Sequence, residues 1–476
     1  MSFPSRSPPG GSSAQSQGRS RGMNTSEATF STDASSRSAS LAIAMEQALV
    51  LEQKLEEEAG SSPSHLALQR MLSLRSVIST ASSFAERQQA AVGQDTEFRE
   101  IGKGSIGIIF EHPGTIHCYK LPLLDNSDKL WNNYTVHTKV QEAFDTANKI
   151  INIDVKIPKM FWFANDKTAE FWDANLDKFP FTEQFPKKTR DTLCMERVLP
   201  LPQPLRNHLI DRYCPRDKES AKLYLPNRDC LVRPLLGRRR RGSGTIAFSL
   251  RSFRLHLDQF EELKLDLVEY ATAMADAMAV LHCIAKIDAM DIEFVIGSAP
   301  SEMHSSGIPL TSAQIENLQP GKSTYEMAKA KDFKRRILCL WVLDFDACKS
   351  IDISEAGARA AVKAFMDTDA YCPRPSQDPQ VHELWKSFGR RYMASYIKFG
   401  ADKRFPQSFL CGVEAEVKAN RTETPASVSS TISRTSSGAT SQTHGRGRGH
   451  GYGQLRRQGS GSREGSVRDL SSNWRK

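Results

Sequence analysis

Three glycines near residue 100 could bind phosphate groups. The segment reads Gly102-Lys103-Gly104-Ser105-Ile106-Gly107, which is a G-x-G-x-x-G spacing, and β-type sequence lies on both sides of it. Glycine suits such a loop because phosphates require close approach of the backbone and conformations that a Cβ forbids. A dinucleotide-binding glycine loop would open a helix, so the strand-like Ile108 to Glu111 argues against that class.

A lysine follows on the next predicted strand. His112-Pro113-Gly114 predicts a turn, and Thr115 to Leu121 returns as a strand that carries Lys120. This order of strand, glycine loop, strand, turn and lysine-bearing strand resembles protein kinases, in which the loop covers the nucleotide phosphates and the lysine pairs with them. The resemblance implies that Gly102, Gly104, Gly107 and Lys120 contact the phosphates of ATP.

Two further segments fall where a kinase-like fold has its regulatory helix and its hinge. Leu130 to Phe144 predicts an amphipathic helix, and Glu142 is the candidate acid to pair with Lys120, with a surface position as the alternative. Thr192 to Val198 predicts a strand ending Met195-Glu196-Arg197-Val198. Glu196 would then lie in the hinge whose backbone meets an adenine, although a central sheet strand explains the same pattern.

The stretch from Asp266 to Gly297 should position the chemistry. Apolar residues at four-three-four spacing, Leu267, Ala271, Met274, Met278 and Leu281, predict a long helix with one buried face. Asp266 followed by Glu269 predicts its N-terminal cap. An acidic loop comes next, and Phe294 to Ile296 predicts a short strand.

The same resemblance gives roles to three acids. Asp288 and Glu293 have the five-residue separation of the kinase catalytic base and a metal-binding residue, and Asp344 ends an apolar strand as the D-F-G aspartate does. It therefore implies Asp288 as the catalytic base, Glu293 and Asp344 as Mg²⁺ ligands, and ATP with Mg²⁺ as cofactors.

The pattern also departs from kinases. Lys286-Ile287 replaces His-Arg, Glu293 replaces an asparagine, and Asp346 replaces a glycine. Gly297 to Lys334 is an insertion where a short turn would suffice, and no A-P-E-like segment follows. Two hypotheses for this fold therefore stay open: an ATP-dependent phosphotransferase with degenerate motifs, and a catalytically inactive pseudokinase that serves as a scaffold or binding module. A third hypothesis, compatible with either, is a nucleic-acid-associated protein that acts through its basic loop and Arg/Gly-rich tail while the globular part is a platform.

Composition limits the remaining classes. The chain has 476 residues, a formal net charge of +9 and nine cysteines without a C-x-x-C pair, so we expect no zinc site and a reducing compartment. No run of about eighteen apolar residues is present and the first residues lack an apolar core, so we expect neither a membrane span nor a secretory signal. The expected location is cytoplasmic or nuclear.

Both ends are rich in small polar residues and should be disordered. The sequence predicts a helix near residues 40–58 that could bind a partner or form only transiently in the tail. The Arg/Gly-rich C-terminal end could bind RNA or be an unselected basic tail. Four arginines from Arg238 could contact nucleic acid or lie in a solvated loop. The expected divisions are a Ser-rich tail (1–95), a β-rich N-lobe (96–200), an α-helical C-lobe with insertions (201–416) and a second tail (417–476).

Several segments also resemble a fungal family that contains a domain of unknown function and is sometimes labelled zinc-finger-like. They are FREIGKGSIGIIFE, LWNNYTVHTKVQEAF, LHLDQFEEL, YATAMADAMAVLH, DIEFVIG and LWVLDFD, spread over Thr96 to Gly400. That family implies no activity. Together with the order of elements, the expectation is an α+β, kinase-like bilobal fold with a small β-rich N-lobe and a larger α-helical C-lobe.

Overall fold

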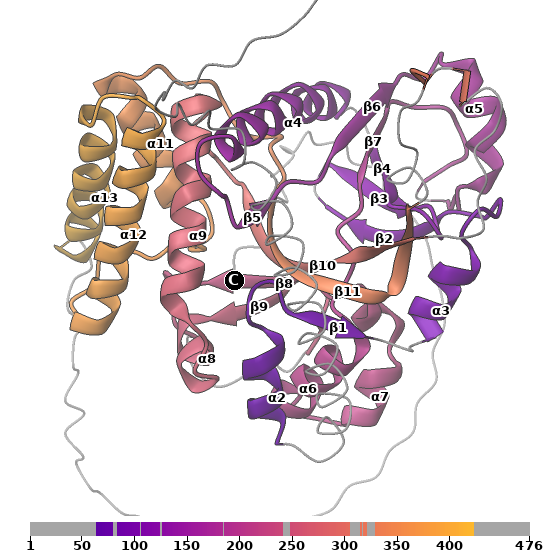
Figure 1. The fold of residues 1–476 in the computed structure, drawn as a ribbon, viewed down its shortest axis with the longest axis horizontal. Helices are drawn as coiled ribbons and strands as arrows, with labels where there is room; N and C mark the ends of the chain where they lie inside the picture. Colours follow the sequence, from indigo (N-terminus) through magenta and orange to yellow (C-terminus); the bar gives the residue numbers. More distant parts are fainter. Residues whose placement is uncertain are drawn as a thin grey trace, which may run out of the picture. The chain divides into compact units, whose positions relative to one another are not determined.

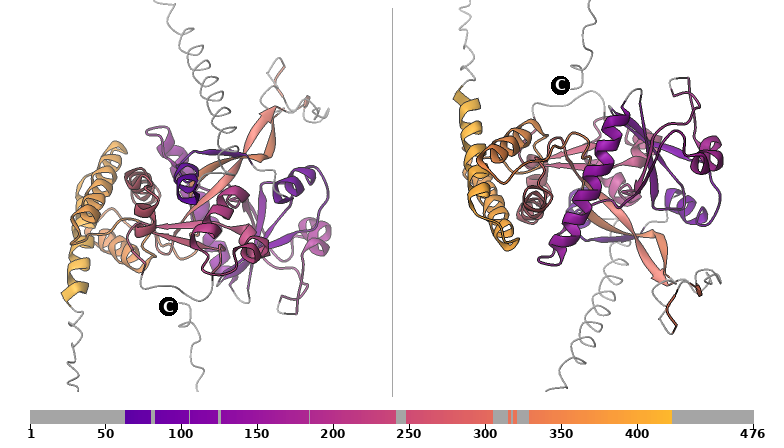
Figure 2. Two further views of the ribbon diagram at one scale, coloured as in Figure 1. Left: turned by 90° about the horizontal axis from the view of Figure 1, so that it is seen from below. Right: turned by 90° about the horizontal axis from the view of Figure 1, so that it is seen from above.

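The computed structural model describes residues 63–79, 83–104, 106–123, 126–183, 185–240, 248–304, 315–316, 318–320 and 329–422. Over these residues the chain is a mixed α+β fold with two β-sheets (Figure 1). In Figures 1 and 2 the six-stranded sheet lies between the five-stranded sheet on one side and a group of long C-terminal helices on the other. The mixed α+β class predicted from the sequence is confirmed.

The five-stranded sheet is antiparallel throughout and has the strand order β2-β3-β4-β7-β6. Helix α4 (Ser127–Asn148) connects its third strand to the strands that follow. Aromatic side chains, including Phe98, Phe110 and Trp172, fill its own small core. The strands are β2 (Arg99–Lys103), β3 (Gly107–Glu111), β4 (His117–Pro122), β6 (Met160–Ala164) and β7 (Thr192–Glu196), with α5 (Ala169–Asn175) and η1 (Leu176–Lys178) after β6.

The six-stranded sheet is built on a long hairpin of β10 and β11, and has the order β1-β11-β10-β8-β9 with β5 parallel to β11. The predicted insertion between the two hairpin strands is, in its described part, an extension of both strands beyond the rest of the sheet (Figure 2). The strands are β1 (Val77–Ser79), β5 (Val155–Lys156), β8 (Val232–Leu235), β9 (Phe253–His256), β10 (Glu293–His304) and β11 (Lys329–Leu343).

The predicted central helix is α9 (Leu267–Ala279), which continues as a π-helix, η3 (Val280–Ile284). Asp266 caps it as predicted, because its carboxylate accepts hydrogen bonds from the backbone N–H groups of Val268 and Glu269. Leu267–Ile284 is long and apolar enough to cross a membrane, but 72% of this stretch is buried in the fold. This burial is what a core helix requires.

The long C-terminal helices pack around α9. Asp276 of α9 is buried and forms a bidentate ion pair with Arg391, with both N···O distances 2.7 Å. The other helices are α6 (Gln203–Tyr213), α7 (Lys218–Leu223), η2 (Leu225–Asp229), α8 (Leu257–Glu262), α11 (Glu355–Asp367), α12 (Pro379–Lys398) and α13 (Arg404–Thr422).

The fold begins earlier than the predicted boundary at Thr96. It includes α2 (Ser64–Met71), β1 and α3 (Ser83–Ala90). Strand β1 pairs with β11 from Val77 to Ser79, and Leu68 and Leu72 are fully buried in the main core. The polar average composition of residues 1–95 predicted a tail, although the segment contains an apolar patch from Leu66 to Ile78. The helix expected near residues 40–58 and the chain after residue 422 lie outside the described residues.

Helix α2 offers a matched pair of leucines for testing this packing. Leu68 is fully buried, whereas Leu66 is 42% exposed on the same helix. We expect Leu68→Ala to lower the free energy of unfolding by about 2–5 kcal/mol, because it removes buried methyl groups and leaves a cavity. Leu66→Ala should change it by less than about 1 kcal/mol. Urea denaturation measures both, and equal effects would contradict the packing of α2 on the core.

Candidate functional site

The glycine loop connects β2 to β3 at one end of the five-stranded sheet. A Cβ on Gly107 would lie 2.6 Å from the backbone oxygen of Leu121, so packing against β4 requires glycine there. A Cβ on Gly102 or Gly104 would meet nothing closer than 3.7 Å. These two glycines are therefore not needed for packing, and their backbone could be approached by a ligand.

Lys120 lies on β4 and reaches the end of the other sheet. Its Nζ is 3.1 Å from Asp344 Oδ1 and 3.3 Å from Asp346 Oδ2, although 224 residues separate Lys120 from Asp344. Asp344 follows β11 directly and has φ of 67°, an uncommon conformation for a residue other than glycine. The structure thus brings together the predicted lysine and the predicted metal-binding aspartate.

The two carboxyl groups beside Lys120 differ in their electrostatics. Burial and the charge of Asp344 raise the pKa of Asp346 to about 6. Burial alone would also raise the pKa of Asp344, but Lys120 and a hydrogen bond with Asp346 outweigh it and lower that pKa. Asp344 is therefore the carboxylate that keeps its negative charge, which a metal ligand requires.

Asp288 lies in a tightly held loop after the π-helix. It is buried, and its Oδ1 accepts hydrogen bonds from the backbone N–H groups of Met290 at 3.1 Å and Lys349 at 2.9 Å. Lys286, Ala289 and Asp291 in the same loop have positive φ, like Asp344. Strained backbone of this kind clusters at functional sites. The loop is thus fixed against the segment that follows Asp344.

Glu293 opens β10 and pairs in register with Leu343, so it lies beside Asp344 at the same end of the hairpin. Glu293 forms an ion pair with an arginine that the sequence did not predict to be part of the site. Arg233 Nη2 of β8 is 2.5 Å from Glu293 Oε1. Burial, only partly offset by Arg233, raises the pKa of Glu293 to about 7. Two of the three predicted acids, Glu293 and Asp344, therefore lie together, and each already has a cationic partner, Arg233 and Lys120 respectively.

Glu142 does not pair with Lys120. It is exposed on α4, whose buried face instead presents Asn133 and His137. The His137 ring packs edge-on against Phe345 with centroids 5.1 Å apart, and its Nε2 lies 2.6 Å from the backbone oxygen of Pro158. The helical spacing of the apolar residues of α4 could have placed His137 on the buried face, but the sequence was searched only for an acidic residue.

The proposed hinge residue is engaged within the sheet. The backbone N–H of Glu196 donates to the oxygen of Lys159 at 2.7 Å, and its carboxylate accepts from the N–H of Lys159 at 3.0 Å. Shortly after it, Leu199 forms an antiparallel bridge with Ser298 of β10. The Thr192–Glu196 segment is thus a central strand of the sheet, which was the alternative explanation of its sequence.

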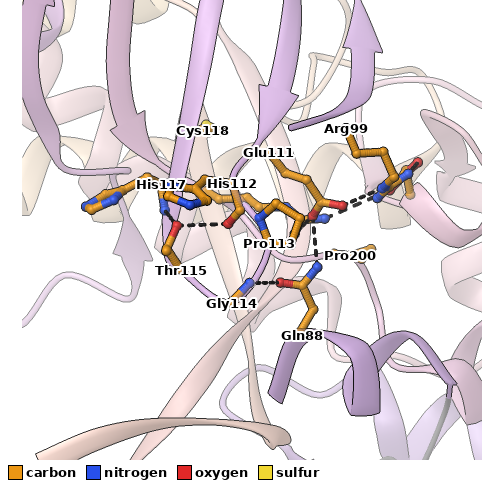
Figure 3. Close-up of polar contacts among 12 residues, drawn as sticks. Gln88, Arg99, Glu111, His112, Pro113, Gly114, Thr115, His117, Cys118 and Pro200 are labelled. Atoms are coloured by element: carbon orange, nitrogen blue, oxygen red, sulfur yellow. Dashed lines mark hydrogen bonds and ion pairs between the residues drawn. The ribbon is translucent and has the colours of Figure 1, made fainter. Parts of the chain in front are cut away.

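A buried ion network ties the five-stranded sheet to η2 and α3. The Glu111 carboxylate accepts hydrogen bonds from Arg99 and Gln88 (Figure 3). It also forms an ion pair with Arg197, and Arg99 makes a bidentate pair with Asp229 at 2.7 and 2.9 Å. Removing one partner from such a network destabilises the folded state, because it leaves a buried charge without compensation. The network therefore fixes the strands that carry the glycine loop relative to the helical part.

Asp346 and residues near it also line an open pocket. The pocket has a volume of about 670 Å³, and Asp346 forms part of its wall. Asn132 of α4 donates to the backbone oxygen of Asp346 at 2.8 Å and so holds this wall in place. The remaining lining residues are Val136, Met290, Ala347, Cys348, Lys349 and Ser350.

The arginine run after Gly237 is partly neutralised within the fold. Arg239 pairs with Glu261 at 2.5 Å and with Asp378 at 3.3 Å, and Arg240 pairs with Asp258 at 2.5 Å. These contacts reduce the positive charge that the run could offer to nucleic acid.

One family model matches the chain, over residues 340–399, and its description reads "Zinc finger protein", a domain of unknown function. No curated protein matches. The matched range holds Asp344 and Asp346 but only two cysteines, Cys348 and Cys372, and all nine cysteines of the chain are free thiols. Among the described residues, no group of three or more His, Cys, Asp or Glu side chains could hold a metal ion.

The buried His137 predicts acid sensitivity. Burial lowers its pKa from 6.5 to about 4, so between these pH values the unfolded chain binds a proton that the folded chain does not. Its contribution to stability is complete above pH 6.5 and is lost as the pH falls toward 4, by about 3 kcal/mol. His137→Gln should weaken the pH dependence of unfolding in urea between pH 7 and 4. An unchanged pH dependence would contradict the burial of a neutral imidazole.

Proposed function

We propose that this chain has a kinase-like fold and binds a Mg-nucleoside triphosphate at the Lys120–Asp344 pair for phosphoryl transfer. The observation that carries the proposal is the 3.1 Å contact between Lys120 Nζ and Asp344 Oδ1. Kinases use a lysine on the third strand for the phosphates and a D-F-G aspartate for Mg²⁺. Side chains of these two types meet here from separate sheets.

The order of elements supports the fold part of the proposal. A glycine loop joins the first two strands of the five-stranded sheet, Lys120 lies on the third, and α4 follows. The buried helix α9, the loop with Asp288 and the hairpin ending at Asp344 come later, next to the long helices. This succession, a five-stranded sheet followed by long helices together with a second sheet, supports the bilobal fold expected from the sequence.

Each residue would have a distinct role. The backbone at Gly102 and Gly104 would approach the phosphates, and Lys120 would neutralise their charge. Asp344 fits Mg²⁺ because a charged carboxylate oxygen is a ligand that this hard cation prefers. Bound Mg²⁺ would supply charge stabilisation for the transferring phosphoryl group. Asp288, fixed by two backbone N–H groups, would orient the acceptor hydroxyl.

A catalytically inactive, pseudokinase-type binding module is the second candidate. Three observations favour it: Asp346 shares Lys120 with Asp344, Arg233 pairs with Glu293, and the backbone of Glu196 is bonded within the sheet. A fold of this kind could still bind protein partners. RNA association through the Arg/Gly-rich C-terminal segment and a cytoplasmic or nuclear location are further proposals from composition, as is the wider relation to the fungal family over Thr96 to Gly400.

Nucleotide binding can be tested by thermal stability of the whole chain with and without Mg-ATP. At a hundredfold its dissociation constant, the ligand should stabilise the folded state by about 2.7 kcal/mol. Lys120→Ala and Asp344→Asn should each abolish this stabilisation, whereas the exposed Glu142→Gln should retain it. If both site variants respond as the wild type does, the assignment of the pair is wrong.

Phosphoryl transfer needs a separate measurement, because binding alone does not distinguish the two candidates. We expect the wild-type chain to release or transfer the γ-phosphate of ATP in a single-turnover assay. Asp288→Asn should slow this step by about 100-fold or more while leaving Mg-ATP stabilisation unchanged. A chain that binds Mg-ATP without any turnover would favour the inactive module.

A further inference from the structure

Arg233 has a position that the proposed reaction does not explain. It lies on β8, whose neighbour Val232 pairs with Ile296 of β10, and this pairing places its guanidinium against Glu293. Its side chain is only 21% exposed, and its charge also acts on Asp344. A fixed cation therefore pairs with Glu293 and acts electrostatically on Asp344, the two carboxylates expected to bind metal.

In protein kinases two Mg²⁺ ions occupy this part of the site, held by the D-F-G aspartate and by the catalytic-loop asparagine. This chain has Glu293 in the asparagine position. Glutamate paired with arginine is close to neutral in total, as an amide is, but the pair keeps a positive group beside the carboxylate. The acid in the asparagine position is therefore compensated by Arg233.

We propose that the guanidinium of Arg233 takes the place of the second metal ion, so that a nucleotide binds here with one Mg²⁺ at Asp344 and with Arg233 beside its phosphates. This inference rests on the proposed function. Arginine suits the role because it stays charged and presents several N–H donors in a planar fork that matches phosphate oxygens. An arginine supplied by the same chain serves a comparable purpose in some phosphoryl-transfer enzymes.

The assignment makes a prediction that does not depend on nucleotide. Lys120 remains beside Asp344 when the charge of Arg233 is removed, but Glu293 loses its cationic partner. A divalent ion should then bind at Glu293, next to Asp344. Mn²⁺ is a suitable probe, because free and bound Mn²⁺ are distinguished by electron paramagnetic resonance. We expect Arg233→Met to bind one more Mn²⁺ per chain than the wild type.

Two controls accompany this variant. Arg254, an arginine of the neighbouring strand β9, pairs with Asp369 at 3.3 Å, and Arg254→Met should leave the number of bound Mn²⁺ ions unchanged. Arg233→Met combined with Glu293→Gln should lose the additional Mn²⁺. An Arg233→Met chain that folds and binds the same number of Mn²⁺ ions as the wild type would overturn the proposal.

A second comparison covers the case in which Arg233→Met does not fold. If the ion pair with Arg233 keeps Glu293 from binding metal, then Glu293→Gln should not change the number of Mn²⁺ ions that the otherwise wild-type chain binds. Loss of a bound ion in Glu293→Gln would show that Glu293 is itself a metal ligand and would contradict the proposal.

The same experiments separate this inference from the proposed function. A chain that gains a Mn²⁺ site in Arg233→Met but is not stabilised by Mg-ATP would refute nucleotide binding and keep the assignment of Arg233. If the wild-type chain is stabilised by Mg-ATP but Arg233→Met gains no Mn²⁺ site, nucleotide binding would be supported and the assignment of Arg233 would be refuted.

Discussion

The ion pairs of Lys120 with Asp344 and Asp346 join the two sheets. Lys120 lies on β4 of the five-stranded sheet, and the two aspartates follow β11 of the six-stranded sheet. Lys120 is buried and needs anionic partners, and the two aspartates at the end of β11 need a cation, so neither side is stable without the other. The rest of the fold maintains this arrangement. The Glu111 network fixes β2 and β3 relative to η2, and α4 holds the segment after Asp344 through Asn132 and His137.

Electrostatic balance distinguishes this site from a simple acidic cluster. Asp344 keeps its negative charge beside Lys120, the raised pKa of Asp346 favours its neutral form, and Glu293 is paired with Arg233. Most of the charge is thus compensated within the protein. A nucleotide bound at the proposed site would have to displace some of these contacts, and its affinity would depend on whether phosphate and metal replace them with stronger ones. Because the charges are compensated in this way, the same arrangement of residues is compatible with both proposed functions, a phosphotransferase and an inactive binding module.

The sequence allowed prediction of residues whose roles depend on local order. Strand alternation and the glycine spacing located Lys120, and the apolar run before Asp344 located the strand that ends there. Arg233 was missed because the adjacent Pro234 argues against a strand at this position, and because its partner lies 60 residues away across a sheet. Glu142 was chosen by residue type, although the helical period places His137 on the buried face. The early start of the fold was missed because a few buried leucines do not alter the average composition of a long polar segment.

A double-mutant cycle on Lys120 and Asp344 tests the central claim most directly. The affinity of the whole chain for Mg-ATP would be measured by calorimetry for the wild type, Lys120→Met, Asp344→Asn and the double variant. Measurable wild-type binding, with losses in the two single variants that are not additive, is the predicted result, since residues in one charged network couple by about 0.5–3 kcal/mol. Absence of wild-type binding at millimolar Mg-ATP, or wild-type affinity in both single variants, would contradict the account.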